Sequence, residues 1–202
     1  VRTRKVTTIL EFGIGKSTYI FDDALKRNEM EFGPFVKEKL RRSNPFELHS
    51  IDNYQDWIDS VKSQATPSLS KNTFLHCCDL NIGTFNDRMC TFYEDLPNIS
   101  PDFIYLDGPD QFSAKGSVRG LSTRHPDSMP MAADILTIEH FLVPGTLIVV
   151  DGRAANARFL KSNLQREWTY SYFPEYDQHF FELLEEPLGP YNKDFLDFVS
   201  SK

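Results

Sequence analysis

A strand that runs into a glycine turn and then directly into a helix stands near the start of this chain. Val6 to Phe12 is rich in Val, Thr and Ile, which predicts a buried strand, and the run stops at Gly13-Ile14-Gly15. A helix is predicted from Ser17 to about Asn28, with apolar residues on one face. Such a unit places the turn at the carboxyl end of a parallel strand, where α/β proteins bind ligands. We therefore expect an α/β fold with a site beside this turn.

Strands and helices continue to alternate along the rest of the sequence. Further strands are predicted at 46–51, 73–78, 103–106 and 146–150, and further helices at 35–42, beyond Asn53, at 131–142 and at 154–168. Two last strands, 169–173 and 179–184, read as an antiparallel pair. The pattern predicts a doubly wound, mostly parallel, seven-stranded Rossmann-like sheet with an antiparallel closing strand.

Length and charge limit what the chain can be. With 202 residues and 40% hydrophobic content it suits one domain, with a core at about 6–184 and a tail of undefined structure at 188–202. A net charge of −7 would repel a phosphate backbone, so we expect no nucleic-acid partner. No apolar run approaches the roughly 18 residues of a membrane span, so we expect no membrane partner.

The cysteines favour a reducing compartment. The three thiols are Cys77, Cys78 and Cys90, an odd number with two neighbours that can hardly bridge each other, and this predicts a cytoplasmic protein. The basic start, Val1 to Lys5, leads into a strand rather than into the apolar core of a signal peptide. The oligomeric state is left open by the sequence, a homodimer included.

Three kinds of ligand loop compete for Gly13 to Thr18. A phosphate-binding P-loop needs an earlier glycine where Leu10 stands, so Gly15-Lys16-Ser17 is half of that motif. The dinucleotide fingerprint needs a third glycine where Thr18 stands. Glu11-Phe12-Gly13-Ile14-Gly15, by contrast, resembles motif I of class I S-adenosylmethionine-dependent methyltransferases, in which an acid precedes Gly-x-Gly.

That resemblance implies a set of residues that bind S-adenosylmethionine. The loop would hold the amino-acid end of the cofactor through Glu11, Phe12, Gly13 and Gly15, and through the helix-start amides of Ser17 and Thr18. Three acids that follow later strands would complete the site: Asp52, with its neighbour Asn53, at the ribose hydroxyls, Asp79 at the adenine, and Asp107 beside the transferring methyl group. The 39 positions from Gly13 to Asp52 require an inserted second helix between Asn28 and Asn44.

Catalysis would centre on Asp107, which can take the proton of an acceptor hydroxyl. Asp110 and His125 are the next candidates, because both lie in or beside a long segment, 110–130, that could close over the substrate. Some small-molecule O-methyltransferases of this fold bind a divalent metal, and Asp107 with Asp151 resembles two of those ligands. The usual third ligand is absent because Gly152 follows Asp151, so Asn156 or Asp110 would have to replace it.

The expected function is methyl transfer from S-adenosylmethionine to a small hydroxylated metabolite or sugar. Arg153 is placed either to hold an anionic substrate or to pair with one of the acids, and Tyr93, Phe112 and Tyr191 are candidates for an acceptor pocket. Two alternatives stay open: an enzyme that binds a nucleotide or NAD at the same edge, and a non-catalytic interaction domain on a methyltransferase scaffold.

Overall fold

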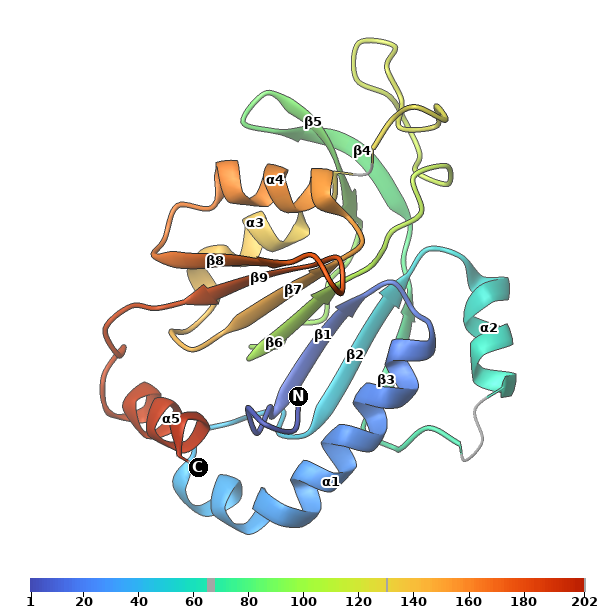
Figure 1. The fold of residues 1–202 in the computed structure, drawn as a ribbon. Coiled ribbons are helices and arrows are strands. Elements are labelled where there is room, and N and C mark those ends of the chain that lie inside the picture. Colours follow the sequence, from blue (N-terminus) through green and yellow to red (C-terminus); the bar gives the residue numbers. More distant parts are fainter. Residues whose placement is uncertain (65–67, 130, 202) are drawn as a thin grey trace.

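A seven-stranded sheet forms the centre of the protein (Figure 1). The computed structural model describes residues 1–64, 68–129 and 131–201, so Pro130, the last residue of the expected closing segment, lies outside the described residues. The sheet strands are β1 (Thr8–Phe12), β2 (Glu47–Asp52), β3 (Thr73–Cys77), β6 (Phe103–Leu106), β7 (Leu147–Asp151), β8 (Trp168–Phe173) and β9 (Gln178–Leu183). A separate hairpin consists of β4 (Leu80–Phe85) and β5 (Arg88–Tyr93).

The strand order, β3-β2-β1-β6-β7-β9-β8, shows where a ligand site is expected. The first five of these strands run parallel, and β9 pairs antiparallel with both β7 and β8. This confirms the expected mostly parallel sheet with an antiparallel closing pair. The outer end differs from the 3-2-1-4-5-6 order of the dinucleotide-binding fold, because β8 forms the edge and β9 returns inside it. From β1 the chain adds β2 and β3 on one side, and it then returns to add β6 and β7 on the other side of β1. The switch in strand order therefore lies between β1 and β6, where such sheets bind ligands.

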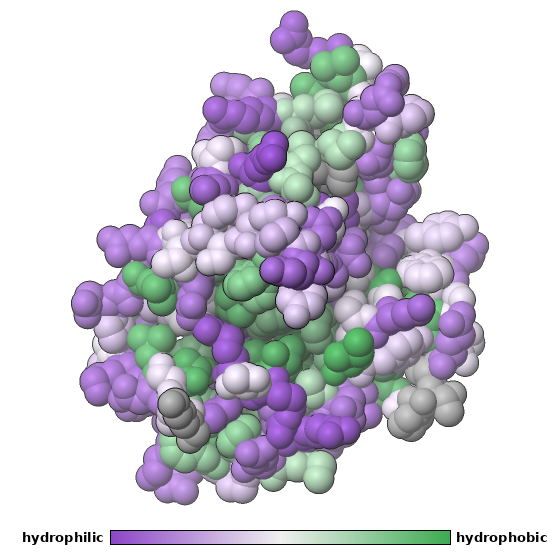
Figure 2. All heavy atoms as spheres, in the orientation of Figure 1, coloured by the Kyte–Doolittle hydropathy of each residue, from purple (hydrophilic) through white to green (hydrophobic). Residues whose placement is uncertain are grey.

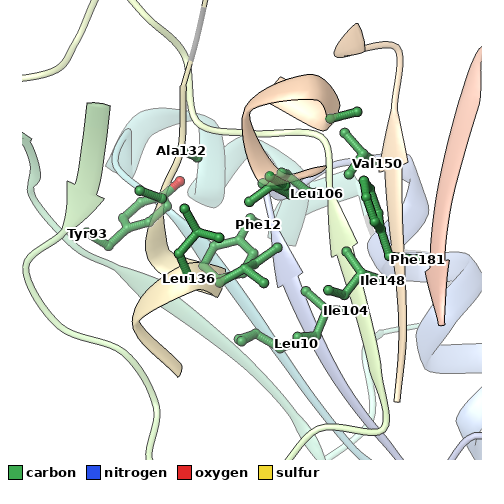
Figure 3. Close-up of a cluster of buried hydrophobic side chains, with 14 of the residues drawn as sticks. Leu10, Phe12, Tyr93, Ile104, Leu106, Ala132, Leu136, Ile148, Val150 and Phe181 are labelled. Atoms are coloured by element: carbon green, nitrogen blue, oxygen red, sulfur yellow. The ribbon is translucent and has the colours of Figure 1, made fainter. Parts of the chain in front are cut away.

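Helices and the hairpin cover the two faces of the sheet. The helices are α1 (Lys16–Lys39), α2 (Gln55–Gln64), α3 (Asp134–Ile138) with the 3₁₀ turn η1 (Glu139–Phe141), α4 (Ala154–Asn163) and α5 (Pro190–Ser200). Alternate residues of β1 point to opposite faces. Leu10 and Phe12 pack in the main core with α3, α4 and the hairpin, as Figure 3 shows around Tyr93 and Leu136. Ile9 packs on the other face against α1.

One helix stands where two were expected. The sequence predicted a helix to about Asn28 and a second one inserted before Asn44, whereas α1 runs unbroken from Lys16 to Lys39 through Pro34. Pro34 is exposed, so water can bind the carbonyl that a proline leaves without its amide partner. The second half of the helix is stabilised by Val36, which packs with Phe195 and Phe198 of α5.

Two other predicted helices are shorter than expected. The helix predicted at 131–142 begins only at Asp134, because Thr91 exchanges backbone hydrogen bonds with Met131 and Ala133 and so holds them beside β5. The helix predicted at 154–168 ends at Asn163, because the amides of Gln165 and Arg166 bond to the buried Glu139 carboxylate. Among the described helices, none is long and apolar enough to cross a bilayer.

The hairpin and α5 were not predicted, although both leave a signal in the sequence. Asn86 and Asp87 both have positive φ, as a tight hairpin turn requires, and these residue types tolerate that conformation. Gly189-Pro190 marks the start of α5, since proline is favoured at the first helical position. The predicted tail at 188–202 is therefore mostly a helix, which packs on the end of α1.

Candidate functional site

A cavity of about 1040 Å³ opens at the carboxyl ends of the parallel strands. Loops that follow β1, β2, β6 and β7 all contribute to it, and it lies at the point where the strand order reverses. In the orientation of Figure 1, Figure 2 shows hydrophobic residues exposed in a hollow beside the start of α1. Several of the expected site residues line the cavity: Gly13, Gly15, Ser17, Asp52, Asp107, Asp110 and Asp151.

Two glycines bring the loops after β1 and β6 together. A Cβ added to Gly13 would lie 2.7 Å from the backbone nitrogen of Gly108, and Gly13 has a φ of +100°. The Asp107 amide donates a 2.9 Å hydrogen bond to the Phe12 carbonyl just before this contact. The close approach places Asp107 beside the glycine turn, with its side chain exposed to the cavity.

Glu11 lies beneath the turn and does not line the cavity. Its carboxylate accepts hydrogen bonds from the hydroxyls of Ser17, Thr18 and Ser50, at 2.5, 2.8 and 2.5 Å. The side chain is fully buried, and this desolvation raises the pKa of Glu11 to about 7. The expected direct contact between Glu11 and a cofactor is therefore replaced by a structural role, because the carboxylate holds the start of α1 in place from below.

Asp52 ties the second loop to the first. One carboxylate oxygen accepts the Ile14 amide at 3.1 Å, and the other accepts the Asn53 and Tyr54 amides at 2.8 and 3.1 Å. Each carboxylate oxygen can accept two hydrogen bonds. The Oδ2 atom, bonded only to Ile14 among the described residues, can still accept a ligand hydroxyl. Asp52 is half-buried and lines the cavity.

An apolar rim that the sequence analysis did not identify surrounds the opening. Ile20, Tyr54, Trp57 and Phe112 line the cavity with 66%, 59%, 46% and 52% of their surface exposed. The Trp57 indole donates a 2.6 Å hydrogen bond to the Ile14 carbonyl, which fixes the ring beside the glycine turn. Only Phe112 was expected near a ligand. Trp57 falls in the helix predicted beyond Asn53, and no local signal distinguishes a rim position from a core position.

Charged groups meet on the deeper side of the cavity. Burial raises the pKa of Asp107, the Asp151 carboxylate raises it further, and the Arg153 guanidinium lowers it. The Tyr105 hydroxyl donates a hydrogen bond to Asp151, and Arg153 donates one of 2.7 Å to the Pro109 carbonyl. Arg153 thus lies between the loops that follow β6 and β7, where its charge acts on Asp107. Among the described residues Arg153 forms no ion pair, so its expected pairing with an acid is not seen, and its charge acts on Asp107 at longer range.

Two buried polar atoms at or next to the cavity have no hydrogen-bond partner among the described residues. They are Arg153 Nε and Asn53 Oδ1. Arg153 lines the cavity, and the Asn53 amide nitrogen bonds to the hydroxyl of Ser113, which also lines it. Buried polar groups without partners are costly, so this side of the cavity is suited to a polar ligand or bound water.

The segment that begins at Asp110 contributes less to the cavity than expected. Asp110 lines the cavity and accepts the Phe112 amide at 3.2 Å. His125 is exposed and does not line the cavity; its ring accepts the Asp127 amide at 3.1 Å and its carbonyl accepts the Gln111 side chain. The expected catalytic position of His125 is therefore not what the structure shows.

Asp79 and Phe12 also lie away from the cavity. Asp79 is exposed and forms a 2.5 Å ion pair with Lys115, because β4 begins directly after it and carries the chain away from the sheet. Its expected place beside an adenine ring is not seen. Phe12 is fully buried and stacks on Tyr93 in the core, and only its backbone lies next to the turn. Tyr93 was expected at an acceptor pocket and is instead a core residue.

The expected metal site lacks a third ligand. Asp107 and Asp151 both line the cavity, but among the described residues no group of three His, Cys, Asp or Glu side chains is arranged to hold a metal ion. The replacement ligand Asn156 is fully buried, and its amide bonds to both the nitrogen and the oxygen of Ala132. Of the two expected substitutes, only Asp110 is near enough to line the same cavity.

The chain matches no protein-family model, and it matches no curated protein.

Proposed function

We propose that this chain is an S-adenosylmethionine-dependent methyltransferase with a Rossmann-like cofactor domain. One observation carries the proposal: the glycine turn, Asp52 and Asp107, separated by many residues in sequence, line one cavity at the switch in strand order. These are the positions that the resemblance to class I methyltransferases predicts from the sequence. The cofactor would supply the methyl group.

The cavity suits the charge and shape of this cofactor. S-adenosylmethionine carries a sulfonium and an amino group, and four carboxylates line the cavity: Asp52, Asp107, Asp110 and Asp151. Such a wall attracts cations. Tyr54 and Phe112 offer exposed aromatic faces for the adenine ring, and Asp52 Oδ2 can accept a ribose hydroxyl. The backbone at Gly15 leaves open space beside the turn, where a ligand can approach closely.

Asp107 is the catalytic residue in this proposal. Its carboxylate is open to the cavity, and partial desolvation and the Asp151 charge raise its pKa, so it can accept the proton of an acceptor hydroxyl as the oxygen attacks the methyl carbon. Bound S-adenosylmethionine would supply the methyl group and would leave as a neutral thioether. The positive charge of Arg153 favours the ionised form of Asp107, so Arg153 acts through Asp107 and is a positioning residue. The acceptor is a small hydroxylated molecule, because the cavity also leaves polar atoms without partners.

The direct test is binding of S-adenosylhomocysteine, ATP and NAD to the purified protein by calorimetry and thermal shift. We expect saturable binding and stabilisation with S-adenosylhomocysteine only, since a ligand that binds the folded state raises the melting temperature. Tight binding of ATP or NAD with none of S-adenosylhomocysteine would overturn the proposal. Repeating the titration with Mg²⁺ and after chelation tests whether Asp107 and Asp151 hold a metal.

A nucleotide-binding enzyme is the second candidate. Lys16 is exposed at the start of α1 and lines the cavity beside Gly15 and Ser17, as the lysine of a P-loop would. A polyphosphate would however meet four carboxylates and only two cationic side chains, Lys16 and Arg153, among the described lining residues. The same panel of ligands decides between the two functions.

A further inference from the structure

A second cavity lies at the opposite edge of the sheet, where the parallel strands begin. It has a volume of about 770 Å³ and is bounded by the loops that lead into β2, β6 and β7, by the end of α3 and by α5. Among their described lining residues the two cavities have none in common. Its size is within the range of about 300–1,000 Å³ that is usual for small-molecule sites.

Most of the wall of this second cavity is apolar. Leu96, Ile99, Ile138, Leu142 and Phe195 contribute hydrophobic side chains from three separate segments. Three more apolar side chains stand at its edge with most of their surface exposed: Phe141 at 80%, Leu188 at 61% and Tyr191 at 60%. Exposed apolar side chains that border a cavity indicate an apolar ligand.

The charge of the cavity is unlike that of the rest of the chain. The sequence has 29 acidic and 22 basic residues, yet the lining residues that the structure describes include Arg41 and Arg42 and neither Asp nor Glu. Both guanidinium groups lie over aromatic rings of α5, Arg41 at 5.2 Å from Tyr191 and Arg42 at 5.5 Å from Phe195. The stacking gathers the two cations on the same side of the cavity.

Arg42 is buried, and its one ion pair among the described residues, with Asp102, is long. Its side chain is 9% exposed and donates from Nη2 to the Thr8 hydroxyl and the Ser100 carbonyl, both at 2.8 Å. The nearest carboxylate, Asp102, is 3.8 Å away, too far for a hydrogen bond, and its oxygens already accept hydrogen bonds from Thr7 and Thr8. The buried Nε atom has no partner among the described residues. A buried arginine with donors to spare needs an acceptor.

We propose that this second cavity binds an amphipathic organic anion, a molecule with an acyl-sized apolar body and a carboxylate or phosphate head. The head would lie at Arg41 and Arg42, because guanidinium groups bind both kinds of anion through paired hydrogen bonds. The apolar body would cover Leu96, Ile138 and Phe195 and shield them from water. The site is separate from the cavity assigned to S-adenosylmethionine and does not depend on the proposed function.

The test is calorimetric titration of the intact protein with three probes of equal chain length: decanoate, decyl phosphate and decanol, all well below micelle-forming concentrations. We expect saturable binding of at least one anion, with decanol at least about tenfold weaker, because the alcohol cannot form the charged hydrogen bonds. The tighter of the two anions identifies the head group. Failure of both anions to bind, or equal binding of decanol, would overturn the proposal.

Three variants locate the binding. Val143→Trp fills the second cavity and should abolish decanoate binding while S-adenosylhomocysteine binding stays unchanged. Ile20→Trp, at the edge of the other cavity, should leave decanoate binding unchanged. Arg41→Gln changes an exposed side chain, avoids the buried bonds of Arg42, and should weaken anion binding at least about fivefold without affecting decanol. Anion binding that survives both Val143→Trp and Arg41→Gln would place it elsewhere and refute the assignment.

Discussion

Gly13 and Gly108 touch backbone to backbone across the carboxyl ends of β1 and β6. A Cβ on Gly13 would lie 2.7 Å from Gly108 N, and one on Gly108 would lie 2.6 Å from Gly13 Cα. Distances this short exclude any side chain at either position unless the loops separate. The contact therefore sets the spacing between the turn that begins α1 and the loop that carries Asp107.

Gly13→Ala should damage both stability and ligand binding. The new methyl group meets backbone atoms, and the φ of +100° is strained for any residue with a side chain. We expect a loss of about 1–3 kcal/mol in the free energy of unfolding by urea denaturation, and at least tenfold weaker binding of S-adenosylhomocysteine. Gly15→Ala is the matched control, since its Cβ meets no atom within 4 Å, and it should unfold like the wild type. Equal stability of the two variants would contradict the importance of the glycine contact.

Asp52→Asn should weaken S-adenosylhomocysteine binding by about tenfold or more, because a charged acceptor for the ribose hydroxyls is lost. Asparagine retains one oxygen for the loop amides, so the fold should persist. Calorimetry measures the affinity. Asp79→Asn is the control: this carboxylate pairs with Lys115 outside the cavity, so the substitution should leave the affinity unchanged. A larger effect at position 79 than at 52 would restore the adenine role that the sequence predicted for Asp79.

Tyr54→Ala and Phe112→Ala should each lower the affinity for S-adenosylhomocysteine by about three- to tenfold, the usual contribution of one aromatic contact. Both rings are more than half exposed and lie at the edge of the cavity, so little folding free energy should be lost. Phe141→Ala removes an exposed ring at the other cavity and provides the comparison. If all three variants bind the ligand equally well, the rim does not contact it.

Arg153→Gln should raise the pKa of Asp107, because the guanidinium charge that favours the carboxylate is removed while burial and Asp151 still disfavour it. Glutamine can still donate to the Pro109 carbonyl. The titration of the Asp107 carboxyl carbon by NMR should move to higher pH, and so should the acidic limb of any methyl-transfer rate. Arg158→Gln, one turn further along α4 and exposed, should leave both unchanged. A shift to lower pH would show that Arg153 does not act on Asp107.

Asp134 should make the protein less stable as the pH rises. Burial raises the pKa of Asp134 to about 7, well above the value of an unfolded chain, so the folded state holds the proton more tightly. The stability that this proton contributes is fully present below about pH 4 and is lost progressively up to about pH 7. Over that range the free energy of unfolding falls by about 1.4 kcal/mol per pH unit. Asp134→Asn keeps the acceptor for the Tyr93 amide and should remove that slope in urea unfolding series. If the free energy of unfolding depends on pH in the same way in the wild type and in Asp134→Asn, Asp134 does not titrate in this range.

Local patterns in the sequence predicted the sheet strands because each is a short apolar run bounded by turn residues. Val6 to Phe12, Phe103 to Leu106 and Thr146 to Val150 differ from the observed strands by at most two residues at either end. The hairpin was missed because β4 and β5 alternate weakly and their turn, Asn86-Asp87, lacks the glycine of the strongest hairpin signal. The helix α1 was predicted as two helices, one to about Asn28 and one at 35–42, whereas Pro34 is tolerated inside a single helix because it is exposed to water.

The sequence by itself determined the α/β class and the strand ends at which polar residues follow, since these depend on hydrophobic periodicity and on turn chemistry. Only the tertiary structure decided which acids reach the cavity. Asp52 and Asp107 face it, Glu11 lies beneath it, and Asp79 leaves it with β4. All four look alike in sequence, as acids near the ends of strands. Their directions depend on the pleat of each strand and on where the following segment packs, and those contacts join residues far apart in the chain.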